Sequence, residues 1–123
     1  MNPAQLLVAS ALLLVAPLTL AEGDAAQGKA LFATQCGFCH STEQGKNLMG
    51  PSLLGVFDRS SGQAPAFNYS AALQAAKLKW DDANLDKWLT KPADLVPGNM
   101  MMYPGQADAQ SRQNLVAYLK TLK

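Results

Sequence analysis

The sequence lacks a dominant charge of either sign. Its 123 residues carry ten Lys and Arg against nine Asp and Glu, a formal net charge of +1, and all of these charged side chains follow residue 21. Proteins that bind nucleic acid carry a basic patch or stripe, so this near balance argues against a nucleic-acid partner. The charges by themselves indicate no ligand.

The sequence also lacks any useful length of alternating apolar and polar residues, which is the pattern of a half-buried strand. We therefore expect an all-α domain. Aspartates at the start of apolar helical spacing are good helix N-caps, and Leu115, Tyr118, Leu119 and Leu122 repeat at i, i+3, i+4 and i+7. The expected helices span 24–35, 70–77, 81–90 and from 108 onward.

Two long stretches have no helical pattern. Glycine, proline and serine are dense between residues 41 and 65, and residues 92–105 are irregular, so both read as loops. Loops of this length are hard to stabilise unless they wrap something. We expect them to enclose a large apolar group.

Long hydrophobic runs are absent except at the N-terminus. Residues 6–21 are almost wholly apolar and are followed by the acidic Glu22-Gly23-Asp24. This pattern predicts a secretory signal peptide over 1–21, cleaved after Ala21, although residues 1–5 contain no Lys or Arg. An uncleaved anchor is the alternative, but the run is shorter than the roughly 20 residues that span a bilayer and Pro17 interrupts it. The mature protein is then a single domain, 22–123.

Cysteine and histidine are scarce: there are two cysteines and one histidine, and all three lie in Cys36-Gly37-Phe38-Cys39-His40. The spacing Cys-x-x-Cys-His is a c-type haem attachment signal. Two thiols three residues apart can each add to a vinyl group of one porphyrin, while the adjacent imidazole ligates its iron. The alternatives are a disulfide or a thioredoxin-like thiol pair, but the latter needs a βαβ setting that the sequence does not predict.

Further motifs extend this pentapeptide into a family pattern. Gly28 and Phe32 precede it, Gly50-Pro51 and Pro97-Gly98-x-x-Met101 follow it, and an aromatic-bearing helix ends the chain. With these motifs residues 22–123 resemble class I c-type cytochromes, most closely the mitochondrial type and its soluble bacterial relatives. The resemblance implies a small cytochrome c fold of about four to five helices, with long loops wrapped around one covalently bound haem c.

The resemblance also implies the haem ligands. It makes Cys36 and Cys39 the thioether attachments, His40 the proximal ligand and Met101 the distal ligand, an arrangement that raises the reduction potential. The residues themselves agree on a methionine, since no second histidine exists, but Met49, Met100 and Met102 remain alternatives.

Other haem contacts follow from the same resemblance. Pro51 would offer its carbonyl to the second ring nitrogen of His40, and Arg59, Tyr69 and Trp80 would donate to a buried propionate. Without a haem these residues read as an ordinary Gly-Pro turn, a surface arginine and core aromatics. Gly28 against Tyr118 resembles the close crossing of the first and last helices.

The function implied is that of a one-electron carrier rather than an enzyme. With His40 and Met101 on the iron, no position stays open for catalysis. The alternatives are a ligand-sensing or catalytic haem protein with a labile methionine, and a Cys-x-x-Cys thiol-disulfide oxidoreductase.

The expected partners are a redox donor and a redox acceptor that dock transiently at the exposed haem edge. We expect an exported, periplasmic monomer without stable membrane insertion. The mitochondrial type surrounds this edge with lysines, whereas several corresponding positions here hold Gln35, Ala93, Asp94, Met100, Ala107 and Asp108. The docking face is therefore expected to be mainly apolar, around Met100, Met102, Tyr103 and Pro104, with weak electrostatic steering.

Overall fold

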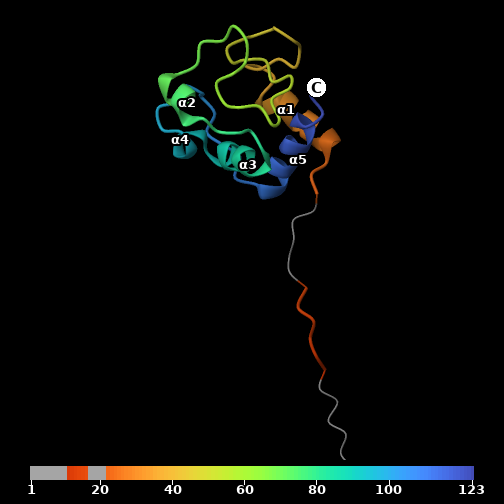
Figure 1. The fold of residues 1–123 in the computed structure, drawn as a ribbon. Helices are drawn as coiled ribbons and strands as arrows, with labels where there is room; N and C mark the ends of the chain where they lie inside the picture. The colour runs from red at the N-terminus through yellow and green to blue at the C-terminus, as the bar shows by residue number, and fades with distance from the viewer. Residues whose placement is uncertain (1–10, 17–21) are drawn as a thin grey trace, which may run out of the picture.

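The computed structural model describes residues 11–16 and 22–123, which form five helices after an exposed N-terminal segment (Figure 1). In those ranges there is no β-strand, only an isolated antiparallel bridge between Ser60 and Lys79. The all-α prediction is thus confirmed. The helices are α1 (Ala25–Gln35), α2 (Ala71–Ala76), α3 (Asp82–Thr90), α4 (Pro92–Leu95) and α5 (Ala109–Leu119).

Most of the expected signal segment, 1–10 and 17–21, lies outside the described residues. Its described part, 11–16, has no regular structure and is exposed. In the portion of the chain that the structure describes, every helix is too short or too polar to cross a bilayer.

Side-chain caps set the helix starts. In each of the four main helices the residue before the first turn accepts a hydrogen bond from a backbone N–H that has no partner inside the helix. These caps are Asp24 to Gln27 N–H at 3.0 Å, Ser70 to Leu73 at 3.1 Å, Asp81 to Asn84 at 2.9 Å and Asp108 to Ser111 at 2.8 Å. The predicted helix starts agree with the structure to within a residue.

The stretch 92–105 is not irregular throughout, which corrects the prediction. Helix α4 begins at Pro92, directly after Lys91, whose φ of −166° and ψ of 102° are extended. Proline needs no N–H partner in the first turn of a helix and its fixed φ suits that position. Pro92 therefore both ends α3 and starts α4.

Helices α1 and α5 lie side by side and join the two ends of the domain (Figure 1). Gly28 sits where they cross: a Cβ at this position would collide with the backbone carbonyl of Asn114 and lie 2.9 Å from the Cβ of Tyr118. Beside the crossing, the rings of Phe32 and Tyr118 meet edge to face, 5.2 Å between centroids. The expected contact between Gly28 and Tyr118 is present.

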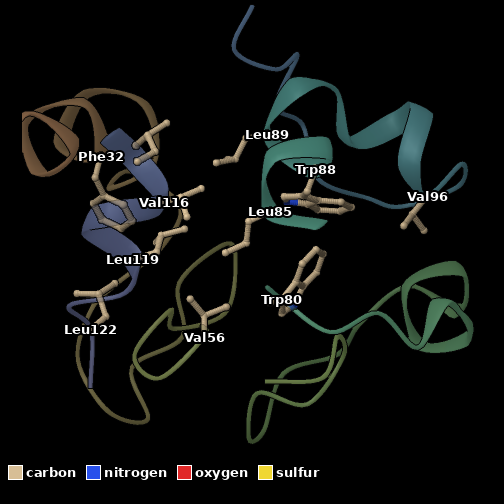
Figure 2. Close-up of a cluster of buried hydrophobic side chains, with 11 residues drawn as sticks. Phe32, Val56, Trp80, Leu85, Trp88, Leu89, Val96, Val116, Leu119 and Leu122 are labelled. Atoms are coloured by element: carbon tan, nitrogen blue, oxygen red, sulfur yellow. The ribbon is translucent and has the colours of Figure 1, made fainter. Parts of the chain in front are cut away.

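The core runs from the α1–α5 pair across α3 to the α4 side (Figure 2). Leu115 is its most enclosed side chain at 1 % exposure, and the indoles of Trp80 and Trp88 pack at 5.2 Å. Around it lies a shell of apolar side chains that are only half-buried, as expected where a small domain cannot close its own core. They include Leu53, Leu54, Phe57, Leu73, Leu78, Leu95, Met101 and Tyr103.

Candidate functional site

A turn at the end of α1 brings the cysteines and the histidine together. The N–H groups of Cys39 and His40 both donate to the carbonyl of Cys36, at 3.0 and 2.9 Å. Cys36 and Cys39 are half-buried and form no disulfide. The two thiols and the imidazole thus come from one tight turn, as attachment to a single planar group requires.

The Cys36 thiol is not an activated nucleophile. Burial, and then the nearby Cys39, raises its pKa from 9.0 to about 11. A thiol-disulfide oxidoreductase needs the opposite, a thiol whose pKa is lowered so that the thiolate can attack. The environment of Cys36 argues against that alternative.

His40 is 9 % exposed, and its Nδ1 lies 2.7 Å from the carbonyl oxygen of Pro51. A carbonyl only accepts, so Nδ1 carries the proton and Nε2 keeps its lone pair. Burial lowers the pKa of His40, against a smaller opposite effect of the Pro51 carbonyl. The imidazole is therefore held neutral, in the tautomer that can ligate a metal through Nε2.

Gly50 is what allows the ring to lie so close to the following loop. A Cβ on Gly50 would collide with His40 Cε1 and lie 2.8 Å from its Nδ1. The Gly50 N–H in turn donates to the carbonyl of Cys39 at 2.8 Å, which ties this loop to the pentapeptide. Gly50 thus leaves space for the His40 ring, and the carbonyl of Pro51 orients that ring.

Met101 lies in a segment without helix or strand, in which exposed and half-buried residues alternate from 100 to 104. Met100 and Met102 are 69 % and 96 % exposed, whereas Met101 between them is half-buried and packs against the core. The segment is linked to the end of α1, because the hydroxyl of Tyr103 donates to Gln35 Oε1 at 2.9 Å. Of the three consecutive methionines, only Met101 is directed inward.

Arg59 and Trp80 lie on two segments that pair through their backbones. The Trp80 N–H donates to the Arg59 carbonyl at 2.9 Å, and Trp80 is 7 % exposed. Arg59 Nη1 donates to the carbonyl of Leu54 at 3.2 Å, but its buried Nε has no hydrogen-bond partner. A buried guanidinium N–H without an acceptor is costly, so this position fits an anionic group.

Tyr69 stands apart from that pair. Its hydroxyl oxygen accepts a hydrogen bond from the Ala64 N–H at 2.9 Å, and its ring meets Phe67 at 5.0 Å. A hydroxyl that already accepts can still donate. The structure therefore leaves the Tyr69 O–H able to serve an anion, without placing it against Arg59.

The residues present fit a covalently attached haem. Two free thiols would serve as anchors, and a neutral buried imidazole and an inward methionine would serve as ligands. The orphaned Arg59 Nε suits a propionate, and the half-buried apolar shell suits the porphyrin faces. Each element is of the chemical type that the corresponding part of the group needs.

Sequence reasoning missed part of this site. The large exposed apolar side chains after residue 21 include Phe38 of the pentapeptide, at 85 %, and Met49, at 70 %, whose Sδ lies 3.9 Å from Cys39 Sγ. The sequence analysis assigned Phe38 no role and considered Met49 only as an alternative ligand, because the exposure of a side chain is not visible in a sequence pattern. The sequence analysis also assigned no role to the Asn99 side chain. An asparagine whose side chain bonds the backbone two residues further along is nevertheless a known turn signal.

Three comparisons bear on the chain. A family model described as "Cytochrome c" matches residues 25–123. Cytochrome c2 of Rhodopila globiformis is 46 % identical over 101 residues, covering 82 % of this chain and 95 % of its own, and cytochrome c of Euglena viridis is 44 % identical over 101 residues, covering 82 % and 99 %. The solved structure of cytochrome cH from Methylobacterium extorquens superposes with a TM-score of 0.75 at 42 % identity, over 80 % of this chain and 99 % of that one.

Proposed function

This chain belongs to the cytochrome c family, and from that membership we propose that it is a one-electron shuttle between larger redox proteins of the periplasm. As a member, it is a haem-based electron-transfer protein rather than an enzyme, and its haem c is attached covalently through cysteine.

Cys36 and Cys39 anchor the haem, and His40 and Met101 ligate its iron. The observation that carries this assignment is the buried His40 ring, whose Nδ1 is bonded to Pro51 so that Nε2 is left as the ligand. The haem supplies a one-electron ferric/ferrous couple. A soft, neutral thioether from Met101 and the apolar shell both disfavour the extra positive charge of the ferric state, which raises the reduction potential.

Arg59 would hold the same haem through one of its propionates. Its Nε donates to a propionate, and Trp80 and Tyr69 contribute further donors. The support for this role is the Arg59 Nε, which is buried and lacks any other acceptor. A guanidinium remains charged at every physiological pH, so it stabilises the carboxylate throughout.

Partners dock on an apolar face around the anchoring residues. Phe38 belongs to the pentapeptide, Met49 touches Cys39, and Met100 and Met102 flank Met101. Of the other two residues expected in this face, Tyr103 is half-buried with its hydroxyl bonded to Gln35, and Pro104 is exposed. We name as the apolar face the five exposed side chains Phe38, Leu48, Met49, Met100 and Met102.

Half of the lysine charges that could steer a partner are paired with a carboxylate. Four of the chain's eight lysines lie within 4 Å of a carboxylate: Lys46 with Glu43, Lys79 with Asp58, Lys91 with Asp94 and Lys120 with Asp82. These exposed pairs add little stability, but they cancel charge locally. The partner surface is therefore largely uncharged as well, and the electron-transfer rate falls only weakly with ionic strength.

The periplasmic setting rests on residues 1–21 acting as a signal peptide that is removed after Ala21. The family model supports this division, because it matches residues 25–123. Mass spectrometry of the protein from periplasmic extract tests it. A mature N-terminus at Glu22 supports export and cleavage, and a retained Met1 contradicts them.

The ligand assignment is tested by optical spectra of the mature protein in both oxidation states. We expect c-type haem bands that stay with the unfolded polypeptide and the weak ferric band of iron–sulfur ligation. Met101→Ala should lose that weak band, whereas Met49→Ala, a matched change in an exposed methionine, should keep it. A band that persists in Met101→Ala would contradict the assignment.

A further inference from the structure

The three consecutive methionines raise a question of register. In an extended segment successive side chains point to opposite sides, so a slip of one residue would exchange Met101 for Met100 or Met102. All three are chemically equivalent as ligands. Something in the chain must therefore fix which of them faces inward.

Asn99 fixes one end of the segment. Its Oδ1 accepts a hydrogen bond from the Met101 N–H at 2.9 Å, and its Nδ2 donates to the Val96 carbonyl at 2.8 Å. The Asn99 N–H also donates to Val96, at 3.1 Å. Val96 is 5 % exposed and belongs to the core. The Asn99 side chain thus links the backbone of Met101 to Val96, which is held in the core.

Tyr103 fixes the other end. Its ring is half-buried against the core, and its hydroxyl donates to Gln35 Oε1, 68 positions away on α1, next to Cys36. Burial points Asn99, Met101 and Tyr103 inward and leaves Met100 and Met102 exposed. Two anchors on the same side as Met101, one before and one after it, oppose a slip in either direction.

We propose that Asn99 and Tyr103 form a register clamp that selects Met101 as the iron ligand over its two neighbours. Both are positioning residues, since they act through the backbone and packing of the segment. This inference rests on the proposed ligation by Met101. It adds that the choice among three methionines is made by the hydrogen bonds of the loop.

The test is carried out on the holoprotein with methyl-labelled methionine, and NMR identifies which methyl group is displaced by the haem ring. In the wild type one methyl signal should be displaced and should vanish in Met101→Leu. In Asn99→Ala with Tyr103→Phe a second displaced signal, from Met100 or Met102, should appear. Each lost hydrogen bond, taken at about 1 kcal/mol, should shift the ratio of registers about fivefold.

Two controls separate register from general destabilisation. Asn99→Asp loses the Nδ2 bond to Val96 but keeps the acceptor for the Met101 N–H and the backbone bond to Val96, so it should retain the displaced Met101 signal as the main one. Asn84→Ala removes an equally local bond, from Nδ2 to the Lys79 carbonyl at 2.8 Å, far along the chain from the segment, and should also retain it.

The clamp variants give a sharper test when they are combined with Met101→Leu, which removes the proposed ligand. Met101→Leu alone should lose the iron–sulfur band, because the clamp keeps both neighbours outside. Adding Asn99→Ala and Tyr103→Phe should restore part of that band. If the clamp variants show only the Met101 signal and restore nothing, the clamp is wrong while the ligand assignment stands. If Met101→Leu alone keeps the band, the clamp is wrong, and if the displaced methyl signal of the wild type is also unchanged in that variant, the ligand assignment fails as well.

Discussion

The α1–α5 crossing makes a quantitative prediction for Gly28→Ala. The added methyl group would meet the backbone carbonyl of Asn114 and lie 2.9 Å from Tyr118 Cβ, and backbone cannot move aside as the tip of a flexible side chain can. Overpacking of this kind costs about 1–3 kcal/mol, and the rigid obstacle places it at about 3. Alanine is about 1 kcal/mol better than glycine inside a helix. The net loss is therefore about 2 kcal/mol.

Thermal unfolding of the ferric holoprotein, followed by far-ultraviolet circular dichroism, measures this loss. A domain of about 100 residues changes its Tm by about 4–8 °C per kcal/mol, so Gly28→Ala should melt about 8–16 °C below the wild type. Gly37→Ala is the matched control, because its Cβ would lie no closer than 3.4 Å to any neighbour, at Ala33 O. A Gly28→Ala protein at least as stable as the wild type would refute the close crossing. The overpacking cost would then be too small to outweigh the gain in helix propensity.

Three further predictions follow from other contacts. Asn114→Ala should lower the free energy of unfolding by about 1–3 kcal/mol in denaturant titration, since its buried amide bonds Asp24 N–H at 2.9 Å and Gln27 Oε1 at 3.3 Å; an unchanged midpoint would contradict this. Arg59→Leu should lower the reduction potential by about 40 mV, because a partly screened positive charge contributes about 1 kcal/mol to the one-electron couple, while the potential of Arg59→Lys should fall by less; a rise in voltammetry would count against the propionate role. The Ser111 hydroxyl and then its N–H hold the pKa of Asp108 below its usual 3.8, so the carboxylate cap stabilises α5 above that pH and its effect fades as pH falls through the folded-state pKa. Acid titration should therefore show the stability gap between wild type and Asp108→Ala narrowing below about pH 4, and a gap independent of pH would exclude this linkage.

Local signals were enough to predict most of the helices. Asp24, Ser70, Asp81 and Asp108 stand immediately before apolar helical spacing, and a cap acts within one turn, so its effect can be read from neighbouring residues. Helix α4 was missed because Pro92 has two opposite meanings. It terminates a helix that precedes it and favours one that follows, and only the extended backbone of Lys91 decides between them.

The functional site likewise has a part that the sequence predicts and a part that it does not. The cysteines and His40 are adjacent, so their spacing alone predicts attachment and ligation. Tyr103 and Gln35 are 68 positions apart, and no spacing rule joins them; their bond exists because the loop after α4 folds back onto the end of α1. The orphaned Nε of Arg59 is likewise invisible in the sequence, because burial without a partner is a property of the packed chain.

His40 and Met101 would both ligate the haem iron and leave no open position, as a carrier requires and a catalyst or a sensor does not. Carbon monoxide added to the reduced protein at neutral pH tests this most directly, because it binds only where a position is open or opens readily. We predict no spectral change on the timescale of mixing in the wild type and prompt binding in Met101→Ala. Rapid, complete binding by the wild type would contradict the claim.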